Sequence, residues 1–74
     1  MPSLRVSFGK TVRELRTNLG MSQEKLAQKA RVSRNFVGSV ERGESSLSVE
    51  AAERMANALG IRLHVLIEQA ERGR

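Results

Sequence analysis

The side chains best suited to chemistry in this chain are polar and lie within nine residues of one another. They are Arg34, Asn35, Ser39 and Arg42. An arginine guanidinium forms two parallel hydrogen bonds with O6 and N7 of guanine, and an asparagine amide does the same with N6 and N7 of adenine. If one helix carries these side chains on its outer face, their chemistry is that of reading base edges in a DNA groove.

A helix from about Arg34 to Arg42 would position them in this way. Ser33 is a residue type that favours a helix N-cap. The apolar residues Phe36, Val37 and Val40 recur at helical spacing and predict the buried side. Arg34 and Asn35 then fall in the exposed first turn, which reaches deepest when such a helix enters the major groove. We expect Arg34, Asn35 and Ser39 to read bases.

A second short helix is predicted directly before it, from Gln23 to Ala30, with Ser22 as its N-cap. Only Arg31, Val32 and the cap Ser33 separate the two helices, which is the arrangement of a helix-turn-helix. Such a unit needs a small residue where the helices cross, and Ala27 stands there. The apolar residues that lock the two helices together are predicted to be Leu26, Val32, Val37 and Val40.

The rest of the chain is predicted to be helical as well. Gly20, Gly43 and Gly60 each follow a stretch of helical periodicity, as is typical of helix ends. The expected inward positions are Phe8, Val12, Leu15 and Leu19 in a helix from about Arg5 to Leu19; Val49, Ala52, Met55, Ala56 and Leu59 in a helix capped by Ser48; and Leu63, Leu66, Ile67 and Ala70 in a last helix. Residues 44–47 read as a loop, and no strand pattern occurs. The sequence predicts a single all-α domain over residues 1–74, a compact five-helix bundle.

The composition argues against several classes of function. The chain has no Cys and no Asp, and His64 is its only histidine. It therefore offers neither a disulfide nor a thiolate zinc site, and its scattered Glu, Ser and Thr residues form no catalytic pattern. We expect no enzyme, no metal and no cofactor. No apolar run approaches the roughly 20 residues of a membrane span, and residues 1–8 do not resemble a signal peptide, so we expect a cytoplasmic protein without a membrane partner.

The charge is concentrated in the first part of the chain. Residues 1–42 hold nine Lys and Arg and three Glu, whereas residues 43–74 hold four Arg and five Glu, so the net charge of +5 divides into +6 and −1. This asymmetry favours a polyanionic partner at one face, although a basic surface also serves solubility.

The run MSQEKLAQKARVSRNFVGSVERG resembles the helix-turn-helix of the phage-repressor and Cro-like regulators, and the similarity covers nearly the whole chain. Within that family the chain is similar to the controller proteins of restriction–modification systems, through the Arg-x-aromatic start of the second helix and the final Glu-Arg-Gly. The resemblance implies the lambda-repressor-like DNA-binding fold and double-stranded DNA as the partner.

The resemblance also implies roles for individual residues. Arg34, Asn35 and Ser39 match base-reading positions, whereas Gln23 and Arg42 match positions that contact the DNA backbone. Apart from the resemblance, contacts to phosphates are also expected from Ser22 and Lys25. Arg16 and Glu41 match an internal ion pair of the family, although two solvated charges would be the ordinary alternative.

Two positions depart from what the family and helix propensity favour. Arg31 stands where the family commonly has Gly in a left-handed turn, a conformation that costs other residues about 1–2 kcal/mol. Gly38 lies inside a helix, where Gly costs about 1 kcal/mol relative to Ala. Gly38 could permit close packing or close approach to DNA, or it could be a tolerated defect.

The last helix carries more apolar surface than its own docking needs. In the resembled family this region is similar to the dimer interface, so a dimer is expected to form through Ile61, Leu63, Val65, Leu66 and Ile67. A two-fold dimer would present its recognition helices to half-sites about 34 Å apart. The alternative is a helix that merely covers the core.

These features favour a homodimeric transcription regulator on a palindromic operator, of the controller or phage-repressor type. It would act as repressor or activator by occupying DNA or by contacting RNA polymerase. The alternative is a protein-interaction module such as the antitoxin of a toxin–antitoxin pair. RNA binding is less favoured, because the only aromatic residues, Phe8 and Phe36, are predicted to face inward and leave no stacking platform.

Overall fold

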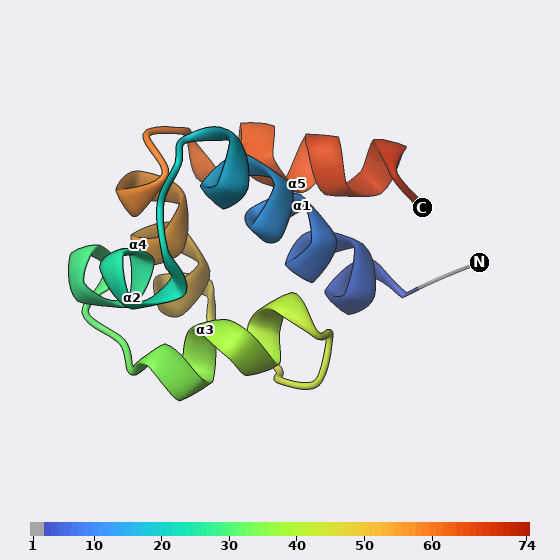
Figure 1. The fold of residues 1–74 in the computed structure, drawn as a ribbon. Helices are drawn as coiled ribbons and strands as arrows, with labels where there is room; N and C mark the ends of the chain where they lie inside the picture. The colour runs from blue at the N-terminus through green and yellow to red at the C-terminus, as the bar shows by residue number, and fades with distance from the viewer. Residues whose placement is uncertain (1–2) are drawn as a thin grey trace.

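Five α-helices make up the protein in the computed structural model, which describes residues 3–74 (Figure 1). Met1 and Pro2, which the predicted domain includes, lie outside the described residues. The helices are α1 (Leu4–Asn18), α2 (Gln23–Ala30), α3 (Arg34–Glu41), α4 (Val49–Ala58) and α5 (Leu63–Arg72). Residues 3–74 contain no strand. The predicted all-α fold with five helices is therefore confirmed.

Serine hydroxyls begin four of these helices. Ser22, Ser33 and Ser48 each accept a hydrogen bond from the backbone N–H three residues further on, at 3.0 Å, as predicted for N-caps. Ser3 caps α1 in the same way, at 3.3 Å. The backbone after α1, α3 and α4 turns at a glycine with a positive φ, and these glycines are Gly20, Gly43 and Gly60. The helix bounds predicted from these local signals therefore agree with the structure to within about one residue.

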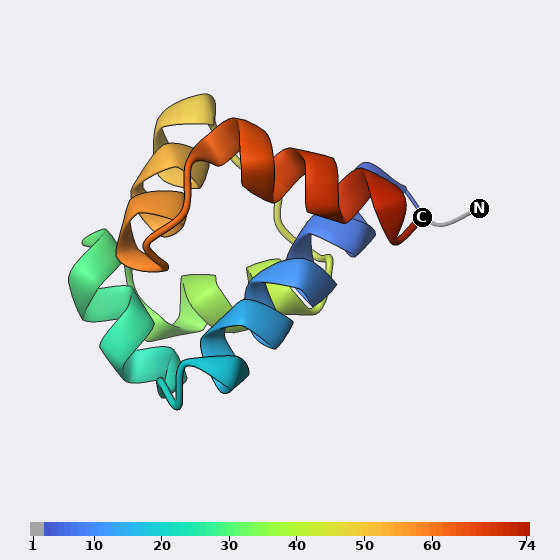
Figure 2. The same cartoon turned by 90° about the horizontal axis from the view of Figure 1, so that it is seen from above.

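The helices enclose one small apolar core. Helix α1 packs against both α3 and α5, and α2 packs against both α3 and α4 (Figures 1 and 2). The largest side chains that are completely buried in this core come from all five helices and are Val12, Leu26, Val37, Val40, Met55 and Leu66. In Figure 1, α3 lies along the lower edge of the molecule, on the opposite side of α1 from α5.

Two residues predicted to face inward lie outside the core. Leu19 follows the last residue of α1, and 57% of its surface is exposed; Val49 is the first residue of α4 and is 76% exposed. Both predictions were wrong because helical spacing was extended to positions at the very end of a helix. At such a position one side of the residue has no neighbouring turn to cover it.

Candidate nucleic-acid interface

Helices α2 and α3 form the helix-turn-helix, and the turn between them depends on the backbone of Arg31. This residue has φ 59° and ψ 45°, the left-handed conformation. The turn is closed by the N–H of Val32, which donates to the carbonyl oxygen of Ala27 at 3.0 Å. Ala27 is 3% exposed, as a residue at the helix crossing should be. Arg31 therefore adopts the conformation for which glycine is usual, at a cost of about 1–2 kcal/mol.

The outer face of α3 carries a polar hollow at its junction with α2. Its volume is about 280 Å³, and its lining residues are Gln23, Arg34, Asn35, Gly38 and Arg42. Arg34 and Asn35 are exposed in the first turn of α3. The structure thus brings two predicted base readers together with Gln23 and Arg42, which were predicted to contact phosphates.

Ser39, the third predicted base reader, lies apart from this hollow. It is half-buried, and its hydroxyl donates to the carbonyl oxygen of Phe36 at 3.0 Å. The same hydroxyl forms a short hydrogen bond with the hydroxyl of Ser45, in the loop after α3. Ser39 therefore ties α3 to the following loop in this structure.

Arg16 and Glu41 form an ion pair beneath the interface. Nε of Arg16 donates to Oε2 of Glu41 at 2.6 Å, and Nη2 donates to Oε1 at 3.0 Å. The two side chains are 11% and 3% exposed. Hydrogen bonding to Glu41 raises the pKa of Arg16 above its ordinary value, against an opposing effect of burial. Nη1 of Arg16 also donates to the carbonyl oxygen of Met21, at 2.8 Å, so one side chain joins α1, α3 and the segment before α2.

The predicted phosphate contacts differ in how the protein already holds them. Gln23 donates from Nε2 to Oε1 of Glu41 at 3.0 Å, which engages one of its two amide hydrogens. Arg42 donates from Nε to Oε1 of Glu44 at 3.1 Å. Ser22 and Lys25 are both exposed at the start of α2, where the hydroxyl of Ser22 serves as the N-cap.

Three polar residues that support this region were not singled out by the sequence. Glu44 holds Arg42, Ser45 holds Ser39, and Nε of Arg54 donates to the carbonyl oxygen of Ala30 at 3.1 Å, at the end of α2. The first two lie in a loop without periodicity, and Arg54 acts across 24 residues. No local sequence signal marks any of them.

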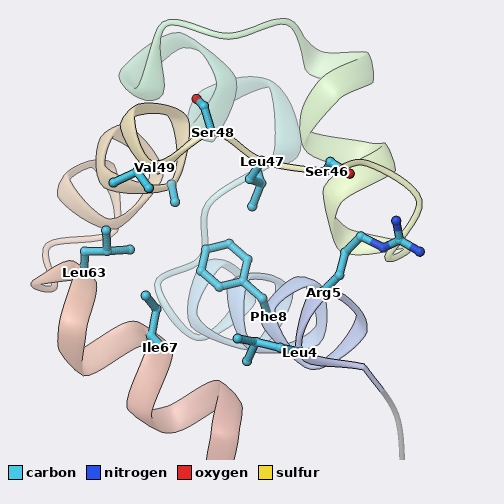
Figure 3. A pocket seen from close by; sticks show the side chains of 10 residues that line it. Leu4, Arg5, Phe8, Ser46, Leu47, Ser48, Val49, Leu63 and Ile67 are labelled. Carbon is cyan, nitrogen blue, oxygen red and sulfur yellow. The ribbon is translucent and has the colours of Figure 1, made fainter.

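The five residues predicted for a dimer interface do not form one surface. Leu66 is completely buried in the core of its own chain, so its side chain is not available to a second subunit. Leu63 and Ile67 line an apolar groove between the start of α1, the loop before α4 and α5 (Figure 3). Val65 lies two positions from both Leu63 and Ile67. Two positions along a helix turn a side chain by roughly 200°, so Val65 lies on another side of α5. Ile61 precedes α5 and is half-buried.

The groove itself is mostly apolar and has a volume of about 360 Å³. Leu4, Phe8 and Leu47 point into it in Figure 3, with Val49 beside Leu63 at its rim.

In residues 3–74 no group of three or more His, Cys, Asp or Glu side chains is placed to hold a metal ion. None of the helices in that range is long and apolar enough to cross a membrane.

Comparison with known proteins gives relatives of one kind. A family model described as helix-turn-helix matches residues 12–66. The control protein C.BamHI of Bacillus amyloliquefaciens is 34% identical over 67 residues, which cover 89% of this chain and 83% of that protein. The immunity repressor of Bacillus phage phi105 is 29% identical over 62 residues, which cover 84% of this chain but 43% of the repressor.

A solved structure agrees in both sequence and fold. The restriction–modification controller protein C.AhdI of Aeromonas hydrophila is 44% identical and superposes with a TM-score of 0.80 over 82% of this chain and 92% of that one. Fold and relatives together define a DNA-binding transcription regulator. The chain belongs to the helix-turn-helix family, and the resemblance to restriction–modification controller proteins and phage repressors is confirmed.

Proposed function

We propose that this regulator binds a palindromic operator as a homodimer and works as a restriction–modification controller does. The observation that carries the proposal is the exposed first turn of α3, where Arg34 and Asn35 lie beside Gln23 and Arg42 on one polar face. Arg and Asn are suited to guanine and adenine edges, and the neighbouring donors are suited to the phosphates that fix the register of the helix. Its compartment would be the cytoplasm, with the operator DNA.

The individual contacts follow from exposure and from the partners that each side chain already has. Arg34 and Asn35 are proposed to read bases, because they are exposed in the turn that reaches deepest. The hydroxyl hydrogen of Ser39 is already donated to the carbonyl oxygen of Phe36, and Ser45 bonds to the same hydroxyl, so we assign Ser39 a smaller share of the recognition. The phosphate contacts are proposed to come from Ser22, Gln23, Lys25 and Arg42.

Random-site selection on duplex DNA tests the proposed activity. The wild-type protein should enrich a two-fold symmetric consensus whose half-sites lie about one helical turn apart. RNA polymerase added to the selected promoter DNA would then show whether the protein excludes it or recruits it. A selection without any enrichment would contradict the proposal and favour the protein-interaction alternative of the antitoxin type.

A dimer is proposed because a reader of this size presents only one short recognition helix to DNA. The apolar groove and the exposed Val49 at its rim supply a surface for a second copy, and Leu63 and Ile67 lie within it. An exposed apolar surface beside a groove is typical of interaction sites. The predicted interface is thereby moved toward the start of α4 and away from the buried Leu66.

The variant Val49→Glu tests this surface without disturbing the core. Val49 is 76% exposed, and an acidic residue at the start of a helix interacts favourably with the helix dipole. We expect Val49→Glu to shift sedimentation at micromolar concentration from dimer toward monomer, whereas Leu19→Glu, which places the same charge on another exposed apolar residue, should leave it unchanged. A wild type that sediments as a monomer, or a Val49→Glu variant that stays dimeric, would contradict the proposed surface.

A further inference from the structure

Gly38 is an unexpected residue in the recognition helix. It lies inside α3, where glycine disfavours the helix relative to alanine. Its φ is not positive, so the backbone does not require glycine at this position. The floor of the polar hollow is formed here, since Gly38 is among the lining residues. The space above Gly38, rather than its backbone conformation, therefore explains the glycine.

Two hydrogen-bond donors occupy the edge of that space. A Cβ atom added to Gly38 would come within 3.0 Å of Nη1 of Arg42 and within 3.9 Å of Nε2 of Gln23. No backbone atom outside the helix is among its nearest neighbours. The atom it would meet first is the far end of a flexible side chain, so the fold can accept a methyl group if the guanidinium of Arg42 moves aside.

A carboxylate stands behind each of these donors. Glu41 accepts one amide hydrogen of Gln23, and Glu44 accepts the Nε hydrogen of Arg42. This leaves the second amide hydrogen of Gln23 and the Nη hydrogens of Arg42 for another acceptor. Arg34 and Asn35 complete the lining of the hollow, whose chemistry is therefore dominated by donors and positive charge.

We propose that Gly38 is a positioning residue for DNA binding, whose missing side chain lets one acceptor-rich group of DNA enter the hollow and accept hydrogen bonds from Gln23 and Arg42. Phosphate oxygens and the O6 and N7 edge of guanine share this chemistry. The inference rests on the proposed function and deepens it. Gly38 would thus serve recognition at the expense of helix propensity.

The variant Gly38→Ala separates recognition from stability. Alanine favours the helix, so we expect the melting temperature to rise by about 4 °C or more. Affinity for the selected operator should nevertheless fall about tenfold, because the methyl group displaces Arg42 and narrows the hollow. Asn57→Ala, at an exposed position in α4, is the matched control: it also replaces a weaker helix former by alanine and should leave the affinity unchanged.

Modified operators identify the group that enters. Single methylphosphonates remove a phosphate charge, and 7-deazaguanine removes N7. One of these substitutions should weaken wild-type binding about tenfold at a single position in each half-site, and should have little further effect on Gly38→Ala. The arm in which the loss occurs distinguishes a phosphate from a guanine.

The results that would overturn the inference differ from those that would overturn the proposed function. A wild type that selects no sequence contradicts the proposed function, and the inference with it. A wild type that selects an operator which Gly38→Ala binds within twofold overturns the inference alone. A lower melting temperature for Gly38→Ala would also overturn it, since the space above Gly38 would then serve packing.

Discussion

Arg16 shows how a single residue organises the interface from below. Its guanidinium bonds to both oxygens of Glu41 in α3 and to the carbonyl oxygen of Met21 before α2. Glu41 in turn holds Gln23 at the start of α2. The side chains of the ion pair are almost completely buried, so the geometry of the helix-turn-helix relative to α1 depends on charges that water cannot readily replace.

Loss of Arg16 should therefore cost more stability than loss of a surface arginine. We expect Arg16→Met to lower the free energy of unfolding by about 3 kcal/mol, because it leaves Glu41 buried without its countercharge. Arg72→Met is the matched control, since Arg72 and its partner Glu68 are 75% and 60% exposed, and it should change stability by less than about 0.5 kcal/mol. Urea denaturation of both variants measures the difference.

The response to pH and to a second substitution checks the same pair. Because the pKa of Arg16 is raised, the stabilisation that it gives at pH 7 is lost only as the pH rises through the folded value. The arginine should thus contribute no loss of stability between pH 7 and about pH 10. Adding Glu41→Leu to Arg16→Met should recover much of the loss. A cost below about 1 kcal/mol for Arg16→Met would contradict a buried pair.

At the scale of helices, Gly9 lets the backbones of α1 and α3 approach each other closely. Gly9 is buried in α1, and a Cβ atom at this position would lie 2.0 Å from the carbonyl oxygen of Val40. The two helices can approach this closely only because Gly9 has no side chain. This contact fixes the distance between α3 and α1. It therefore also fixes how far the outer face of α3 lies from α1.

Gly9→Ala should accordingly destabilise the protein although alanine favours helices. Overpacking typically costs 1–3 kcal/mol, and here the obstacle is a backbone atom that cannot turn aside. We expect the free energy of unfolding to fall by about 2 kcal/mol or more, measured by urea denaturation. Gly38→Ala, the same substitution in α3, should change stability in the opposite direction. Equal effects of the two substitutions would contradict the difference in their surroundings.

The helices themselves were predictable, because their signals are local. Ser22, Ser33 and Ser48 cap the helices predicted from them, and the glycines with positive φ follow α1, α3 and α4. Gly9 and Gly38 were not distinguishable, since each depends on atoms that folding brings close. For Gly9 these atoms belong to Val40, more than 30 positions along the chain. Val49 and Leu19 were misplaced because periodicity does not reveal where a helix stops covering its neighbours.

The candidate site was predictable in its residue types and less so in its connections. The exposed positions of Arg34 and Asn35 follow from the apolar pattern of α3 and agree with the structure. The bonds of Ser39 to Ser45 and of Arg42 to Glu44 depend on the path of the loop after α3, which has no periodic signal. The surface for a second subunit was placed on α5 as a whole, whereas packing divides that helix between core and groove.

For the whole molecule, we propose that a basic first half carries a helix that distinguishes DNA sequences. Net positive charge alone would attract any duplex, with an affinity that falls steeply as salt is added. Recognition of bases adds a preference for one sequence that is retained when the salt concentration is changed. The contribution of charge and that of base reading are therefore separable by experiment.

The most direct test is the ratio of dissociation constants for a scrambled duplex and for the selected operator, measured at two salt concentrations. The wild type should prefer its operator by a factor of about 10³ or more. Arg34→Ala and Asn35→Ala should each reduce that ratio by about tenfold or more. Arg72→Ala, which removes an exposed arginine from α5, should leave it unchanged. A ratio near one for the wild type, or a ratio that survives both substitutions in α3, would contradict base recognition by this helix.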